Sequence, residues 1–91
     1  MAEYKVVATV VKAQGECGAN HKVGDRYEFG VTTPAGFCCH AFGAIWPTVN
    51  LLMNGGQYAW DSEPGRTYWG CPDTQNLVMF QLRRVEVPAT E

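Results

Sequence analysis

The sequence predicts an α+β fold, in which a small, mostly antiparallel sheet is covered by one kinked helix or by two short helices. Residues 4–12 and 76–87 both have strand patterns, because β-branched and other apolar residues recur in them. Between them, residues 33–53 carry apolar residues at the three- and four-residue steps typical of a helix. A chain of 91 residues suffices for one small core, so we expect a single domain over residues 1–91.

The first half of the predicted sheet consists of two strands separated by a loop. Residues 4–12 are apolar on both faces, which predicts a central strand. Residues 13–25 are polar and rich in glycine, as loops are. A short strand is expected over residues 26–31, after a tight turn at Val23-Gly24-Asp25. The residues expected to share one face of this strand are Tyr27, Phe29 and Val31.

The predicted helix begins with a capping residue and a proline. Thr33 can cap the first turn, and Pro34 suits the first helical position because no N–H is needed there. The ring of Pro47 would collide with the carbonyl group of Gly43, so we expect a kink, or a second helix beginning near Pro47. Asn54-Gly55-Gly56 predicts the end of the helix. The apolar stripe consists of Cys38, Ala41, Ile45, Val49 and Leu52.

The last third of the chain combines an aromatic segment with a final strand. Residues 57–70 are rich in turn formers, which predicts a hairpin or an irregular flap. Its aromatic residues either complete the core or supply contact area for a partner. The strand over residues 76–87 changes phase after Arg83, which predicts a bulge or the sheet edge there. The aromatic residues of the flap are Tyr58, Trp60, Tyr68 and Trp69.

Charge and composition indicate which classes of partner the protein has and in which cellular compartment it lies. The formal net charge is −2, and the single basic cluster is Arg83-Arg84. We expect no nucleic-acid partner, because nucleic-acid-binding proteins usually carry a dense basic face. The first residues show no secretory signal, and no apolar run reaches the length of a membrane span. These features predict a cytoplasmic protein with no membrane partner, whose thiols stay reduced.

The four cysteines and His21 favour a metal site over a disulfide framework. Cys38 and Cys39 are adjacent, and a disulfide between neighbours closes a strained, rare ring. Two long-range bridges stay geometrically open, although a reducing compartment argues against them. Cys17 and His21 are separated by three small residues, and such a loop can fold both donors toward one centre.

Two further segments supply soft ligands. Cys71 lies on a turn that Pro72 stiffens, and Cys38 lies near the start of the predicted helix, whose N-terminus favours a thiolate. The predicted ligands are Cys17, His21, Cys38 and Cys71, with Cys39 as an alternative to Cys38. Three thiolates and one imidazole suit tetrahedral zinc and also an iron–sulfur cluster, so the cofactor stays open between these two. The donors are widely spaced and include no Cys-x-x-Cys pair.

Each candidate ligand also has a structural interpretation. Cys38 on an apolar stripe can be a small core residue, and a lone His21 in a polar loop is commonly exposed. His40 lies off the Cys38 stripe, and we expect it to be solvated. On this interpretation the cysteines are reduced structural thiols, and the chain is a metal-free interaction domain.

The same segments carry a family resemblance. The landmarks are Cys17…His21-Lys22-Val23-Gly24-Asp25, Thr33-Pro34-Ala35-Gly36-Phe37-Cys38, Ala41, Pro47, Gly55-Gly56, Cys71-Pro72-Asp73, Val78-Met79-Phe80 and Arg83-Arg84-Val85. Over almost its whole length the chain resembles an uncharacterised family of short bacterial and archaeal domains, found singly or in tandem. It departs from the family at Asn20, where glycine is expected, and Cys39 is an additional cysteine. The resemblance implies a self-contained module and brings no reaction with it.

These observations favour a small metal- or iron–sulfur-binding module. We expect a non-catalytic accessory or subunit of a larger enzyme or complex, which therefore has a protein partner. A thiol-based enzyme is one alternative, with His21 and Asp25 or Cys38 as its reactive groups, although no triad, phosphate loop or carboxylate pair accompanies them. A redox sensor is another, joining Cys38 or Cys39 to Cys17 or Cys71. No specific small-molecule substrate follows from the sequence.

Overall fold

Four antiparallel strands form one sheet in the order β2-β1-β4-β3. The computed structural model describes residues 3–15, 21–72 and 75–87. The long strands β1 (Glu3–Ala13) and β4 (Val78–Val87) pair in the middle of the sheet. The short strands β2 (Arg26–Phe29) and β3 (Arg66–Gly70) lie at its edges. The predicted central position of the first strand is confirmed.

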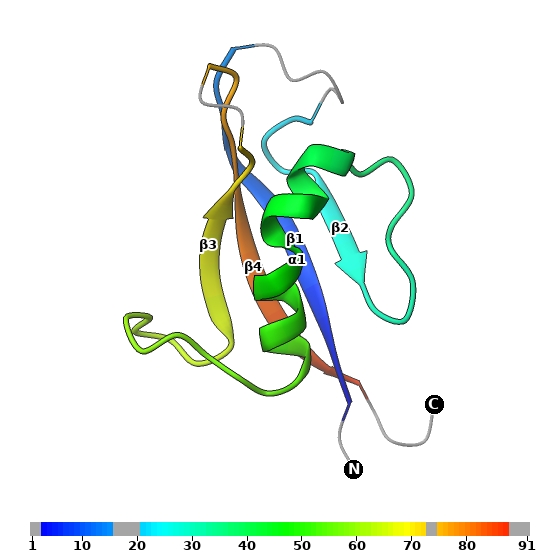
Figure 1. Ribbon diagram of the computed structural model, residues 1–91, viewed down its shortest axis with the longest axis vertical. Helices are drawn as coiled ribbons and strands as arrows, with labels where there is room; N and C mark the ends of the chain where they lie inside the picture. Colours follow the sequence, from blue (N-terminus) through cyan, green and yellow to red (C-terminus); the bar gives the residue numbers. More distant parts are fainter. Residues whose placement is uncertain (1–2, 16–20, 73–74, 88–91) are drawn as a thin grey trace.

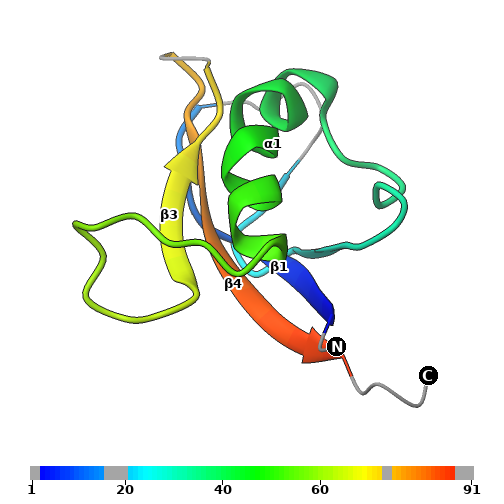
Figure 2. The same cartoon turned by 60° about the horizontal axis from the view of Figure 1, so that its bottom comes forward.

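One helix, α1 (Cys39–Met53), packs on one face of this sheet (Figures 1 and 2). The core between helix and sheet takes alternate residues of the strands and one stripe of the helix. This arrangement confirms the predicted α+β class. The buried apolar side chains are Val6, Ala8, Val10, Phe29, Ala41, Ile45, Val49, Leu52, Val78, Phe80 and Leu82.

The helix begins five residues later than the sequence predicts, at Cys39 instead of Pro34. Neither Thr33 nor Pro34 is helical, and Cys38 is the residue that precedes the first turn. The physical reason is Gly36, whose φ of +78° is left-handed and interrupts any helix begun at Pro34. The irregular segment turns Phe37 onto the core, with its ring centroid 5.2 Å from that of Phe80.

A single helix continues through Pro47 rather than dividing there. Pro47 is exposed, and Gly43, whose carbonyl loses its partner, is exposed as well. The helix ends as predicted at Asn54, where Gly55 adopts a φ of +82° and the Gly56 N–H binds the Leu51 carbonyl.

Two predicted details of the strands are wrong. The second strand ends at Phe29, so Val31 does not share its face and is fully exposed. The bulge lies at Val11 in β1 and not after Arg83 in β4. β4 keeps its phase because Arg84 continues the core-facing positions and donates to the carbonyl groups of Leu52 and Gly56, at 3.2 and 2.9 Å.

Candidate functional site

The candidate ligands that the structure describes lie at one end of the molecule. At the upper end in Figure 1, β1 and β3 finish and α1, β2 and β4 begin. His21 precedes β2, Cys38 precedes α1, and Cys71 directly follows β3. Segments that are far apart in the sequence therefore bring these three residues to the same end of the sheet.

His21 is the best-defined polar residue of this end. Only 4% of it is exposed, contrary to the structural interpretation that places it in solvent. Its Nδ1 atom lies 2.8 Å from the Tyr27 hydroxyl oxygen, and its Nε2 atom accepts the Cys38 backbone N–H at 3.3 Å. An Nε2 atom that accepts carries no proton, so in the neutral ring Nδ1 carries the proton and donates to Tyr27.

Aromatic rings surround the imidazole. The ring centroids of Tyr27, Phe37 and Phe80 lie 5.0, 5.3 and 5.9 Å from that of His21. Burial among these rings disfavours the charged form and lowers the pKa of His21 below its ordinary value, against a smaller upward effect of Asp25. The site therefore holds a neutral imidazole whose Nε2 lone pair points toward the start of α1.

Asp25 stabilises its own turn. Its carboxylate accepts the Lys22 N–H at 2.9 Å, and its N–H binds the Lys22 carbonyl oxygen at the same distance. The predicted tight turn before β2 is thereby confirmed. Among the described residues, the side chains of His21 and Asp25 form no hydrogen bond or ion pair with each other, so the hypothesis that this pair acts as a base gains no support. His40 is exposed, as predicted.

The cysteines differ in their surroundings. Cys38 is half-buried and packs against the core, whereas Cys39 is exposed and lines an open hollow of about 170 Å³ with Phe37 and Phe42. Cys71 is half-buried, and its Sγ atom accepts the Val78 N–H at 3.2 Å. The Cys71 thiol also donates to the Asn76 carbonyl oxygen at 3.9 Å.

The remaining candidate ligand, Cys17, lies outside the described residues, as do Asn20 and Asp73. Among the described residues, no three His, Cys, Asp or Glu side chains are grouped closely enough to hold a metal ion. The structure thus brings His21 against Cys38 and places Cys71 at the same end, without assembling a complete ligand shell from residues 21–72 and 75–87.

Sequence reasoning missed Tyr27 and Phe37 as partners of His21. The sequence predicts Tyr27 as a strand residue beside Phe29 and Phe37 as a helical residue, and nothing in it indicates that either contacts the imidazole. Of the predicted flap, residues 66–70 form the edge strand β3, and residues 57–65 are irregular. Tyr58 stacks on Trp60 and Trp69 and binds Thr48, while Trp60 stays 68% exposed.

Comparison with family models, with curated proteins and with solved structures finds no match to this chain. The resemblance to a family of short bacterial and archaeal domains therefore stays a prediction. Within the described parts of the chain, α1 is too short to cross a membrane, and no other helix is present there.

Proposed function

We propose that this chain is a small metal-binding module that holds zinc or an iron–sulfur cluster through Cys17, His21, Cys38 and Cys71. In this proposal it serves as a non-catalytic accessory or subunit of a larger enzyme or complex. The observation that carries the proposal is the 3.3 Å contact between His21 Nε2 and the Cys38 N–H. It joins the loop that contains the Cys17–His21 pair to the start of the helix.

The place of Cys71 supports the same ligand set. Trp69, two residues before it, pairs with Phe80, whose ring touches the His21 ring. The Cys71 N–H binds the Val78 carbonyl oxygen, so Cys71 continues the β3–β4 pairing at this end. The chain also leaves the described residues at Gly15 beside Asn76 and returns at His21. Gly15 therefore lies near the end of β4 that pairs with Cys71, and His21 lies next to Cys38.

The orientation of His21 indicates which ring atom would bind. Nε2 carries the lone pair, and a metal there would take the place of the Cys38 N–H. Nδ1 would keep its hydrogen bond to Tyr27, and a second partner of this kind commonly orients a ligating histidine. A bound metal would then add directly to the folding free energy of a chain whose core is small.

Metal content of the anaerobically purified protein tests the proposal. We expect about one zinc ion per chain in a colourless protein, or iron and sulfide in a protein that absorbs visible light. Cys71→Ser should lose most of this metal and unfold at a lower temperature. The matched control is Cys39→Ser, which changes an exposed thiol and should keep the metal.

Three outcomes separate the alternatives. A protein without metal, in which Cys17→Ser and Cys71→Ser keep full stability, would contradict the proposal and favour a metal-free interaction domain. Loss of metal in Cys39→Ser but not in Cys38→Ser would assign Cys39 as the ligand. A new intramolecular crosslink under peroxide, in a protein that holds no metal, would indicate a thiol redox sensor instead.

A further inference from the structure

No other described helix or strand covers the face of the sheet opposite α1 (Figure 2). Strand residues alternate between the two faces, and the pairing register identifies those that point away from the helix. We call this side the outer face. It carries five of the seven lysines and arginines of the chain, which are Lys5, Lys12, Arg26, Arg66 and Arg83.

The bulge at Val11 contributes to this distribution. Lys12 would share the inner face with Ala8 and Val10 if β1 continued without interruption. The extra residue shifts the pairing so that Lys12 lies opposite Met79, which points outward. A lysine that would otherwise point toward the core is thereby added to the outer face.

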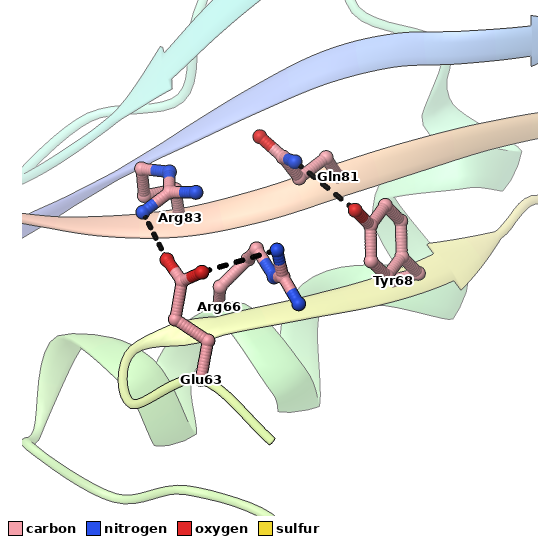
Figure 3. Close-up of polar contacts among 5 residues, drawn as sticks. All are labelled: Glu63, Arg66, Tyr68, Gln81 and Arg83. Carbon is pink, nitrogen blue, oxygen red and sulfur yellow. Dashed lines mark hydrogen bonds and ion pairs between the residues drawn. The ribbon is translucent and has the colours of Figure 1, made fainter. Parts of the chain in front are cut away.

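Acidic residues neutralise only part of this charge. Lys5 pairs with Glu28 at 3.2 Å, and Glu63 bridges Arg66 and Arg83 at 3.1 and 2.6 Å (Figure 3). Lys12 and Arg26 form no ion pair with another described residue. The described side chains therefore leave a positive excess on the outer face, although the whole chain has a net charge of −2.

The outer face also offers apolar surface between its charges. Val7 is half-buried in its middle, Met79 is half-buried near the end where β3 finishes, and Val85 is exposed near the other end. Apolar side chains among these charges supply contact area for a protein partner. Tyr68 is an unsuitable platform for a nucleobase, because Arg66 already lies over its ring at 5.4 Å and Gln81 binds its hydroxyl (Figure 3).

We propose that the outer face docks an acidic segment of a partner protein, in which carboxylates alternate with apolar residues. The size of the face sets the strength of this contact. The 11 residues of β1 extend about 35 Å, and four strands place the outer two about 14 Å apart. The rectangle defined by these two lengths is smaller than the ~800 Å² that each partner buries in a stable interface, so the complex is transient.

A labelled peptide of about ten residues, with Glu and Asp alternating with Leu, tests the docking surface by fluorescence anisotropy. We expect binding in the range of about 10 to 500 μM at low salt, weakening as salt screens the charges. The double variant Lys12→Glu and Arg26→Glu should weaken binding at least about tenfold. Both side chains are exposed, so the fold tolerates the change.

The control is Lys22→Glu, which reverses one exposed charge on the loop before β2, against two in the double variant, and should change binding less than about threefold. Absence of binding at low salt, or equal effects of the two sets of substitutions, would overturn the proposal. Tighter binding of an oligouridylate of matched length would overturn it in favour of a nucleic-acid surface. None of these outcomes depends on whether the chain holds a metal.

Discussion

The two ends of α1 are each held by a polar side chain from another part of the chain. At the N-terminal end, the His21 ring accepts a hydrogen bond from the N–H of Cys38, the residue before the helix. At the C-terminal end, Arg84 of β4 donates hydrogen bonds to the carbonyl groups of Leu52 and Gly56. The first contact gives a partner to an N–H group that a helix start leaves unpaired, and the second adds a charged donor to the Leu52 carbonyl, which also accepts the Gly55 N–H.

The difference between the ends lies in whether the contact can be switched. A guanidinium stays charged at every physiological pH, suits the negative end of the helix dipole and packs over the Tyr4 ring at 4.8 Å. An imidazole accepts an N–H only while its nitrogen is free of a proton or a metal. The contact at the C-terminal end of α1 is therefore present at every physiological pH. The contact at the N-terminal end depends on whether His21 is free of a proton or a metal, and we call this the conditional end. The candidate ligands lie there.

Replacing Arg84 should produce the largest effect, because it removes a fixed contact. In Arg84→Met the two carbonyl groups lose a charged donor, and we expect the free energy of unfolding to fall by about 2–3 kcal/mol. Urea unfolding measures the change. The matched control is its neighbour, Arg83→Met, whose exposed pair with Glu63 should cost less than about 1 kcal/mol. Equal losses in the two variants would remove the special role of Arg84.

The conditional end should produce a smaller effect that depends on pH. The pKa of His21 is lowered in the folded state from its ordinary 6.5, so the folded state favours the neutral ring. The stability linked to this ring is therefore complete above pH 6.5 and falls as the pH drops toward the lower folded pKa, by at most about 1.4 kcal/mol per pH unit.

Urea unfolding of the metal-free protein at several pH values measures this slope. His21→Gln should lack it, because the amide does not titrate. Arg83 lowers the pKa of Glu63 from its ordinary 4.5, so the stability linked to Glu63 is lost only in a more acidic range. A slope just below pH 6.5 that persists in His21→Gln would contradict the assignment to this ring.

The sequence was sufficient for the class of fold and for most of the core. The predicted helical stripe from Ala41 to Leu52 is buried, and the predicted last strand supplies Val78, Phe80 and Leu82 to the core. The helix start could not be predicted, since its position depends on the left-handed Gly36. The apparent change of phase after Arg83 was misleading because Arg84, a charged residue, faces inward to reach the end of α1.

The candidate site was predictable only as a set of residue types. The pairing of His21 with the start of the helix follows from tertiary structure, in which Phe37 and Phe80 bury the imidazole. No spacing in the sequence indicates that Tyr27 lies against Nδ1, although this contact determines which ring nitrogen is free. The choice between zinc and an iron–sulfur cluster is likewise not encoded in the donor types.

Cobalt(II) titration of the reduced, metal-free protein tests most directly whether the conditional end of α1 holds a metal. We predict intense visible bands of tetrahedral cobalt and a near-ultraviolet thiolate-to-metal band, which saturate at about one equivalent. These bands should be lost or strongly altered in Cys38→Ser and His21→Gln and retained in Arg84→Met. Weak bands of octahedral cobalt in the wild type, or unchanged bands in Cys38→Ser and His21→Gln, would contradict the account.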